Sequence, residues 1–450
     1  MNRTWRLVAA ALTVGLATSV QALAQSDAFR YYLCYTTGGD DRQQGNDWGS
    51  QLQFDDWLMD REAVILYQHH LGNFPRAGVH MVYSTPTYMQ DHLARVAWAV
   101  DKFVPNPDFS GVAIIDYEIW RCEWDRTPNV PSPLGPDAED RDFKDDWRDH
   151  VLMTYPHFKS MSPSEQEDFL RDTYEQACAD FYLATLRLCQ EMRPKAKWGF
   201  YGYPSKIFKH QTDTPKNVIG YGDHTHRASQ INDRLRWMWE AVDALFPSYY
   251  APRYTLLAGE PSHCPNQEAS REEDREFLRS NVAEARRLGK GKPVYAVSWL
   301  RYHTPNKGCR FYEFLNEINL RNQFEVPYLA GADGVVLWGN LLNEADYLSE
   351  QAYFDRMFIP TLADIMLTYG LYEGGDGKAG GDGGSGDGKG DGSDQGDQGE
   401  GDGSVGDDAD APPPPPADRL NNSRGGGNEG RGAVQKPRDN RNPGGRNERP

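Results

Sequence analysis

The stretch FSGVAIIDYEIWRCEW, residues 109–124, carries the main clue to the fold. Its first part, Gly111 to Ile115, is an unbroken run of apolar or small residues, which is typical of a strand buried on both faces. Asp116 and Glu118 follow directly, with one aromatic residue between them. Residues two apart on a strand point to one face and lie roughly 6.5–7 Å apart. The stretch therefore predicts a buried strand that ends in two carboxylates on one face.

The same pattern recurs between residues 29 and 345. Short β-branched or aromatic runs alternate with segments that have apolar residues every three or four positions, such as 90–104, 164–192, 230–246 and 271–289. The predicted strands are FRYYLCYTT, AVILYQHH, GVAIIDYE, KWGFYGYP, ALFPSYYA, KPVYAVSWLR and GVVLWGN. Strands that alternate with helices require a parallel sheet covered by helices.

A closed barrel accommodates these units better than an open sheet does. About seven units occur, and no G-x-G-x-x-G turn of the kind found in doubly wound nucleotide-binding sheets follows any of the runs. We therefore expect an α/β fold, a distorted (β/α)7-type TIM-like barrel.

The carboxyl ends of the runs carry the candidate chemistry, as is usual in such barrels. Asp116 and Glu118 end the third run, and the ends of other runs supply a predicted rim of aromatic residues. These aromatic residues are Tyr201, Tyr203, Tyr249, Tyr250, Trp299 and Trp338. Two acids this close in a partly dry site resist ionising together, so one of them should have a raised pKa. Such a pair suits glycosidic cleavage, in which one acid protonates the leaving oxygen and the other stabilises positive charge. The structural alternative is that the acids pair with an arginine or cap a loop.

The two ends of the chain differ in composition from the body. Residues 1–24 have two arginines, an apolar stretch and Ala-Leu-Ala before Gln25, which predicts a cleaved signal peptide; the alternative is an uncleaved membrane anchor. Residues 373–450 are first Gly/Asp-rich, then contain PPPPP, and end Arg/Asn-rich, which predicts a disordered tail. We therefore expect a secreted or periplasmic protein whose barrel spans residues 25–372, with no stable insertion in a membrane.

Six cysteines, at positions 34, 122, 178, 189, 264 and 309, all lie in the predicted mature part. An exported chain can oxidise them, so we expect one or two disulfides and leave their connectivity open. Cys178 and Cys189 are eleven residues apart on a predicted helix, roughly 16 Å by helical rise, so they should not pair with each other.

Five stretches resemble, in the same order, those of the hyaluronidases of glycoside hydrolase family 56. The resemblance spans roughly residues 63–362. PDFSGVAIIDYEIWRCEW is similar to the family's P-D-F-S-G-hydrophobic-D-W-E-x-W-R-P, and RPKAKWGFYGYP to R-P-…-W-G-F-Y-G-F-P. The others are LYQHHLGNFP, NDRLRWMWEAVDALFPSYYAP and GADGVVLWGN.

The resemblance implies a (β/α)7-type barrel and a retaining endo-β-N-acetylhexosaminidase acting on the β-1,4 links of hyaluronan or chondroitin. It implies that the substrate's own N-acetyl oxygen is the nucleophile and that no cofactor or metal is required. Glu118 occupies the acid/base position, and Asp116 the position that stabilises the cyclised acetamido intermediate. The positions implied to line the substrate are Tyr201, Ser248, Tyr250 and Trp338. The implied partner is a polysaccharide, and we expect no nucleic acid.

The chain departs from the family's pattern at several positions. Tyr117 replaces a Trp, Cys122 replaces a Pro, and Ser205 to Phe208 replace Asp-Cys-Tyr-Asn. Glu350 stands at a family cysteine, and Asn281 at an Arg implicated in holding a substrate carboxylate. These departures spare the catalytic pair and bear on the glucuronate subsite, and hence on specificity for hyaluronan.

Charge bears on the substrate as well. Of the formal net charge of −18, residues 371–411 hold −10 and residues 417–450 hold +4, which leaves −12 for the rest. An acidic body repels a polyanion at low salt, so we expect binding to rest on stacking and on local groups such as Arg121. The alternative for Arg121 is a structural ion pair with a strand-end acid.

Other readings of the site remain open. A family-18 chitinase-like enzyme needs a further acid two residues before Asp116, where this chain has Ile114. A non-catalytic glycan-binding protein could keep the aromatic rim, and a glycosidase could act on another N-acetylated polysaccharide. His224 and His226, or the adjacent His69 and His70, would form a metal site in a third class of function.

Overall fold

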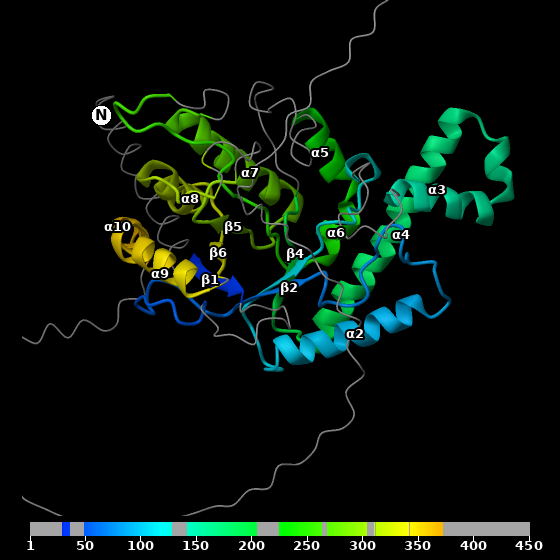
Figure 1. The fold of residues 1–450 in the computed structure, drawn as a ribbon, viewed down its shortest axis with the longest axis horizontal. Helices are drawn as coiled ribbons and strands as arrows, with labels where there is room; N and C mark the ends of the chain where they lie inside the picture. Colours follow the sequence, from blue (N-terminus) through cyan, green and yellow to red (C-terminus); the bar gives the residue numbers. More distant parts are fainter. Residues whose placement is uncertain are drawn as a thin grey trace, which may run out of the picture. The chain divides into compact units, whose positions relative to one another are not determined.

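The strands of the chain close into a barrel. The computed structural model describes residues 29–36, 49–127, 142–204, 225–262, 268–303, 310, 312–341 and 343–371, all within one compact unit. Parallel strands form two three-stranded sheets, ordered β1–β6–β5 and β2–β3–β4 (Figure 1). The strands are β1 (Arg30–Thr36), β2 (Ala63–Tyr67), β3 (Val112–Asp116), β4 (Lys197–Phe200), β5 (Tyr295–Trp299) and β6 (Gly334–Asn340).

Backbone hydrogen bonds join the two sheets along two seams. At the first seam, Asp60 pairs with β1: the Leu33 N–H donates to the Asp60 carbonyl, and the Asp60 N–H donates to the Tyr31 carbonyl, both at 2.8 Å. At the second seam, the extended segment 244–248 pairs with the end of β4 on one side and with β5 on the other. The described residues therefore form a closed ring of six strands and one extended segment. This ring is the distorted β/α barrel that the seven runs predict.

Alternate side chains of the ring enter two separate apolar cores. The inner core fills the barrel with residues such as Val112 and Ile114 of β3, and the outer core lies between the ring and the helices. Gly199 of β4 allows a close approach inside, because a Cβ at this position would lie 2.2 Å from the Ala244 carbonyl oxygen. Asp116 continues the inward row of Val112 and Ile114, two residues apart along β3.

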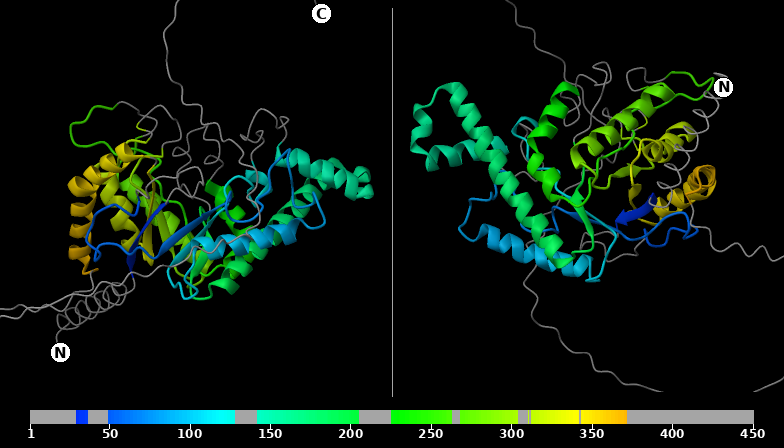
Figure 2. Two further views of the ribbon diagram at one scale, coloured as in Figure 1. Left: turned by 60° about the horizontal axis from the view of Figure 1, so that its bottom comes forward. Right: turned by 180° about the vertical axis from the view of Figure 1, so that it is seen from behind.

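Helices cover the outside of the ring (Figures 1 and 2). Helix α2 packs on α4, and α7 packs on α8. The helices are α2 (Tyr88–Phe103), α3 (Phe143–Thr154), α4 (Pro163–Met192), α5 (Thr225–Arg234), α6 (Arg236–Ala241), α7 (Arg271–Gly289), α8 (Glu317–Leu329), α9 (Glu344–Tyr353) and α10 (Ile359–Tyr369). Short helical turns are η1 (Trp124–Arg126), η2 (Pro156–Ser160) and η5 (Phe354–Phe358).

Helix α4 begins at a cap that is visible in the sequence. The Ser162 side chain accepts a hydrogen bond from the Glu165 N–H, the Glu165 carboxylate accepts one from the Ser162 N–H, and Pro163 opens the first turn. This capping box satisfies two of the N–H groups that a helix start leaves without partners. The cap sets where α4 begins, and the spacing of its buried residues determines which face lies against the ring.

The structure confirms most of the predicted elements and corrects one. Predicted helices 90–104, 164–192 and 271–289 correspond to α2, α4 and α7. The prediction of a single helix over 230–246 is wrong, because α6 ends at Ala241 and residues 244–248 join the ring. Ala244 and Phe246 are needed there to fill the barrel interior. The predicted signal peptide and the whole of the predicted tail lie outside the described residues, and none of the described helices has the length and apolar character of a membrane span.

Asp274 is a carboxylate buried between α7 and α8. Its Oδ2 accepts hydrogen bonds from Asn322 Nδ2 at 2.6 Å and from Asn319 Nδ2 at 3.1 Å. Burial raises the pKa of Asp274 to about 6, although the two asparagines and nearby arginines act in the opposite direction. The folded state therefore binds this proton more tightly than the unfolded chain does.

The stability contributed by Asp274 should be present in full below about pH 4 and lost as pH rises through about 6. A shift of about two pKa units corresponds to roughly 3 kcal/mol. We expect Asp274→Asn to avoid this loss. The difference in unfolding free energy between variant and wild type, from urea denaturation, should grow by roughly that amount between pH 4 and pH 7.5. Glu272→Gln, at an exposed position on the same helix, is the control, and a pH-independent difference for Asp274→Asn would contradict the prediction.

Candidate active site

Asp116 ends β3 and faces the interior of the barrel. Its side chain is only 8% exposed, and its Oδ1 has no hydrogen-bond partner among the described residues. Burial first, and then the charge of Glu118, raise the pKa of Asp116 well above its usual range, while Arg121 lowers it. The predicted raised pKa thus falls on Asp116. A buried carboxylate oxygen without a partner can accept a hydrogen bond from a ligand N–H group.

Glu118 lies two residues further along, in the loop that follows β3. Its side chain is 50% exposed, and its Oε1 lies 3.9 Å from Nη2 of Arg121. An exposed ion pair of this length contributes about 0–1 kcal/mol at most. Arg121 therefore adjusts the charge at the site without holding Glu118 tightly, and the carboxylate of Glu118 remains accessible to a ligand.

Gln68 holds the backbone of this pair from the neighbouring strand. Its N–H donates to the Asp116 carbonyl at 2.9 Å. Its Oε1 accepts from the N–H groups of Glu118 at 3.0 Å and Ile119 at 3.2 Å. Gln68 therefore fixes the point at which β3 gives way to the loop. The sequence prediction missed it, although it directly follows Tyr67, which pairs in register with Asp116.

Helix α4 holds the following part of the loop through hydroxyl groups. The Tyr182 hydroxyl donates to the Trp120 carbonyl at 2.8 Å, and the Tyr174 hydroxyl donates to the Arg121 carbonyl at 3.0 Å. Both tyrosines are buried. The loop therefore leaves β3 and lies directly on one face of α4.

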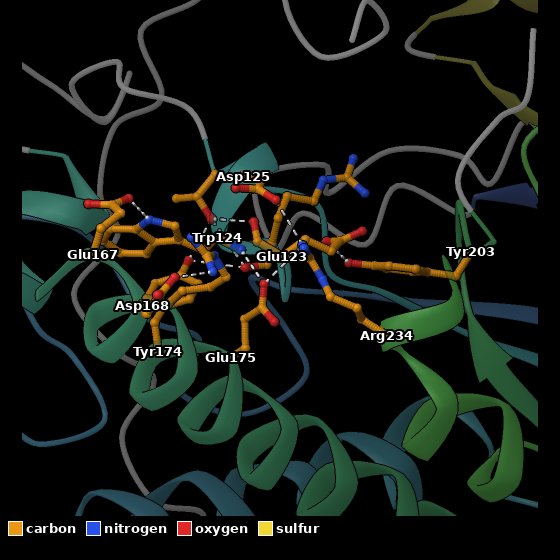
Figure 3. Close-up of polar contacts among 12 residues, drawn as sticks. Glu123, Trp124, Asp125, Glu167, Asp168, Tyr174, Glu175, Tyr203 and Arg234 are labelled. Carbon is orange, nitrogen blue, oxygen red and sulfur yellow. Dashed lines mark hydrogen bonds and ion pairs between the residues drawn. The ribbon is translucent and has the colours of Figure 1, made fainter. Parts of the chain in front are cut away.

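Acidic side chains extend this attachment beyond the tyrosines (Figure 3). Nε1 of Trp124 donates to Oε1 of Glu167 at 2.6 Å, and the Trp124 N–H donates to Oε1 of Glu175 at 3.1 Å. Glu123 is fully buried and its Oε2 accepts from the Tyr203 hydroxyl at 3.2 Å. Residues 117–127 are thus tied to both α4 and the end of β4.

The four predicted substrate-lining residues lie together at the carboxyl ends of the strands. Nε1 of Trp338 donates to the Tyr67 hydroxyl at 2.6 Å, and the Tyr250 ring stacks on Trp338 with centroids 5.7 Å apart. The Tyr201 ring lies 6.0 Å from that of Tyr250, and its hydroxyl donates to Ser248 Oγ at 3.1 Å. These residues form one continuous chain of contacts. Tyr67 belongs to it and was missed in the sequence.

The predicted aromatic rim is only partly correct. Trp299 belongs to it, with its ring 5.4 Å from that of Trp338. Tyr203 and Tyr249 are instead buried in the outer core. Tyr249 precedes an inward-facing residue and so points the other way, and Gly202, with a φ of +73°, turns the chain just before Tyr203.

Positions that differ from the family's pattern have local packing roles. Tyr117 points outward, where its ring lies 4.6 Å from that of Phe74. Glu350 is buried, accepts from the Tyr35 hydroxyl and forms an ion pair with Arg301 at 2.7 Å.

Asn281 is buried within α7, and its Nδ2 donates to the Phe277 carbonyl of the same helix at 2.8 Å. That amide therefore bonds to its own helix. Residues 205–208 lie outside the described part of the chain.

The histidines whose side chains the structure describes form no recognisable metal centre. The rings of His69 and His70 lie 3.9 Å apart. Within the described ranges, no group of three or more His, Cys, Asp or Glu side chains could hold a metal ion. His224 and the side chain of His226 lie outside those ranges.

Comparison with known proteins gives a consistent result. The hyaluronidase family model matches residues 48–362. Hyaluronidase-1 of Bos taurus is 29% identical over 317 residues, and hyaluronidase-1 of Homo sapiens is 28% identical over 326. These alignments cover 67% and 68% of this chain, and the chain spans 62% and 65% of the lengths of those relatives.

A solved structure shares the fold. The crystal structure of bee venom hyaluronidase in complex with a hyaluronic acid tetramer aligns with a TM-score of 0.55 at 21% identity, over 75% of this chain and 99% of that one. The family model matches most of the barrel, and the ring of seven strand segments agrees with this match. The chain therefore belongs to the hyaluronidase family.

Proposed function

We propose that this protein is a retaining endo-β-N-acetylhexosaminidase that hydrolyses β-1,4 links in hyaluronan or a related glycosaminoglycan such as chondroitin. The observation that carries the proposal is the buried Asp116, whose Oδ1 has no partner among the described residues, beside the accessible carboxylate of Glu118. Membership of the hyaluronidase family and the hyaluronic acid bound to the bee venom relative support the choice of substrate.

In the first step Glu118 acts as the general acid. It donates its proton to the glycosidic oxygen as the bond between that oxygen and C1 breaks. The acetamido carbonyl oxygen of the same sugar attacks C1 and closes a five-membered ring. Positive charge then develops on the acetamido nitrogen, and ionised Asp116 accepts the hydrogen bond from its N–H. Burial raises the pKa of Asp116, and this hydrogen bond and positive charge act in the opposite direction by favouring the ionised carboxylate. A preformed charge in a buried site stabilises such an intermediate more strongly than water does.

In the second step Glu118 acts as the general base. Its carboxylate takes a proton from water, the water oxygen attacks C1, and the ring reopens to the acetamido group. Two displacements at C1 restore the original anomeric configuration. Glu118 is left protonated and Asp116 ionised, as at the start.

The aromatic residues position the sugar for these steps. Trp338 is partly exposed and stacks on the buried Tyr250, and the free part of its ring suits the apolar face of a sugar. Tyr201 and Ser248 offer hydroxyl groups at hydrogen-bonding distance from each other, and these can contact the acetamido group. Arg121 offers a cationic group, 25% exposed, for an acidic sugar.

Export completes the proposal. Residues 1–24 act as a signal peptide, residues 25–372 form the catalytic barrel, and residues 373–450 form a solvated tail. Support comes from the composition of each segment. The protein then binds its polysaccharide outside the cell or in the periplasm.

The proposed chemistry predicts large losses from two single substitutions. Glu118→Gln should lower kcat by about 10²- to 10⁴-fold because glutamine cannot donate the proton. Asp116→Asn should lower kcat by about 10²- to 10³-fold because a neutral amide stabilises the positive intermediate less. Both are measured as reducing-end release from hyaluronan, chondroitin and an unsulfated N-acetylated polymer between pH 4 and 8. Glu62→Gln is the matched control, because Glu62 is exposed and directly precedes β2, at the end of the strands opposite to the site.

Three outcomes of that experiment lead to different conclusions. Loss of hyaluronan or chondroitin cleavage in both variants supports the proposal. Cleavage of the unsulfated N-acetylated polymer alone, if it is lost in the same variants, supports the mechanism but shows that the substrate is another N-acetylated polysaccharide. Binding without release from any polymer contradicts the enzyme and favours a non-catalytic glycan-binding protein.

Arg121 should set the acidic limb of the pH profile. Its charge lowers the pKa of Asp116, which must be ionised for the reaction. Arg121→Gln removes that charge, so the pKa of Asp116 rises further and the acidic limb of kcat/KM should move to higher pH by roughly one unit. Arg121→Lys retains the charge and should restore most of the profile. A change in KM with an unmoved limb would argue for a purely substrate-binding role.

Gln68 should act as a positioning residue. Gln68→Met removes the oxygen that accepts from the Glu118 and Ile119 N–H groups while it keeps the side-chain length. We expect kcat to fall about ten- to a hundredfold with little change in KM, since small displacements of a catalytic group are costly. Gln68→Glu retains an acceptor oxygen and should recover much of kcat. Equal kcat values for both variants would contradict this role.

A further inference from the structure

Two cysteine side chains are buried beneath the loop that carries Glu118. Cys122 lies four residues after Glu118, and Cys178 lies in the middle of α4. Both side chains are fully buried in the outer core, and the structure shows both as free thiols. Cys122 stands where the family's pattern has proline.

The register of α4 places Cys178 directly against this loop. It lies four residues after Tyr174 and four before Tyr182, which is about 6 Å along the helix in each direction and on the same face. The hydroxyls of those two tyrosines bond to the carbonyls of Arg121 and Trp120. Cys178 is therefore held between two contacts with the residues just before Cys122.

Electrostatic interactions agree with this placement. Burial raises the pKa of the Cys178 thiol, and the next largest cause is a side-chain hydrogen bond with Cys122. The pKa values of Tyr174, Tyr182 and Tyr203 are all raised, mainly by burial. Electrostatic interactions with Cys122 and Cys178 also raise each of the three pKa values. Both thiols thus lie within one cluster of buried tyrosines.

The other two described cysteines are placed differently. Cys34 belongs to the inner core of the barrel, on the opposite side of the ring. Cys189 lies eleven residues after Cys178, roughly 16 Å along α4 by helical rise. Among the described cysteines, Cys122 and Cys178 are therefore the two that the contacts between the loop and α4 bring to the same part of the outer core.

We propose that Cys122 and Cys178 form a disulfide bond that ties the loop after Glu118 covalently to helix α4. The oxidant is a small-molecule or protein disulfide of the compartment into which the chain is exported. One cysteine thiolate attacks that disulfide, and a mixed disulfide forms as one thiol leaves. The second thiolate then displaces the other thiol. Two cysteine thiols and one external disulfide become one protein disulfide and two external thiols.

Burial determines when this bond forms. Neither sulfur is accessible in the folded state, so oxidation occurs while α4 is not yet docked or during a local opening. Once formed, the bond is shielded from soluble reductants by the same packing. The bond itself does not depend on the proposed function; only its benefit for holding Glu118 rests on that function.

Peptide mapping tests the bond directly. The full chain is produced by secretion, unfolded in guanidinium with N-ethylmaleimide and no reductant, and digested with trypsin. Cleavage after Arg121, Arg126, Arg171, Arg187 and Lys195 places Cys122 in peptide 122–126, Cys178 in 172–187 and Cys189 in 188–195, since trypsin does not cut the bond between Arg193 and Pro194. We expect 122–126 linked to 172–187, at the sum of their masses less two hydrogens. Alkylation of both cysteines, or a link from either one to another cysteine, would refute the proposal.

A redox difference in thermal stability provides a second measurement. The bond would close a loop of 56 residues, and the chain-entropy relation predicts that it raises Tm by roughly 5 °C. We compare Tm of the secreted chain with Tm of the same chain reduced in denaturant and refolded with reductant. Cys178→Ala should reduce the difference by roughly that amount, whereas Cys189→Ala, which removes a buried thiol of the same helix, should leave it unchanged.

The two proposals can fail separately. A linked peptide in a protein without glycosidase activity would leave the disulfide intact and refute the enzyme. Activity in a chain whose Cys122 and Cys178 are both alkylated would do the reverse. A redox difference in Tm that is as large in Cys178→Ala as in the unsubstituted chain would also refute the disulfide.

Discussion

Along β3 successive side chains point to opposite sides of the ring, and the arrangement of the site depends on this alternation. Asp116 enters the barrel because Val112 and Ile114 do, and Tyr117 enters the outer core for the same reason. A slip of one residue would place the carboxylate among the helices and an aromatic ring at the centre of the barrel. The apolar residues before Asp116 therefore act on the chemistry by setting its register. Their burial provides stabilisation that offsets the cost of holding a carboxylate away from water.

The loop after β3 has little regular structure of its own, so other elements must satisfy its backbone groups. Gln68 accepts from two of its N–H groups, and two tyrosine hydroxyls of α4 donate to its carbonyls. The bond from Tyr182 is buried, where hydrogen bonds are stronger and an unpaired group is costly, and the bonds of Tyr174 and Gln68 are partly buried or exposed. Glu118 can therefore be exposed on one side and still belong to a well-positioned backbone. A helix on the outside of the barrel thus contributes to the geometry at its mouth.

Much of the barrel could be predicted because each strand is a short apolar run with turn residues around it. The carboxylate pair could be predicted because it ends such a run. Gln68 could not, because a glutamine gives no local signal, and its role depends on the alignment of β2 with β3. Tyr203 was misplaced because a left-handed glycine before it breaks the strand alternation. The helix over 230–246 was extended too far because residues that fill a barrel are as apolar as those of an amphipathic helix. For Gln68 and for residues 244–246 the deciding contact comes from a part of the chain distant in sequence, whereas for Tyr203 the backbone conformation of the preceding glycine decides.

The ring of the barrel consists of two sheets joined along seams, and this affects its mechanical stiffness. Asp116 comes from one sheet and Trp338 from the other, and the hydrogen bond between Trp338 and Tyr67 crosses the seam at Asp60. A sugar bound between Asp116 and Trp338 would connect the two sheets. Small displacements at either seam would change the distance between Asp116 and Trp338. Residues such as Asp60, which lie at a seam, would therefore influence how easily the site deforms, and a polymer bound across both sheets would stiffen the ring.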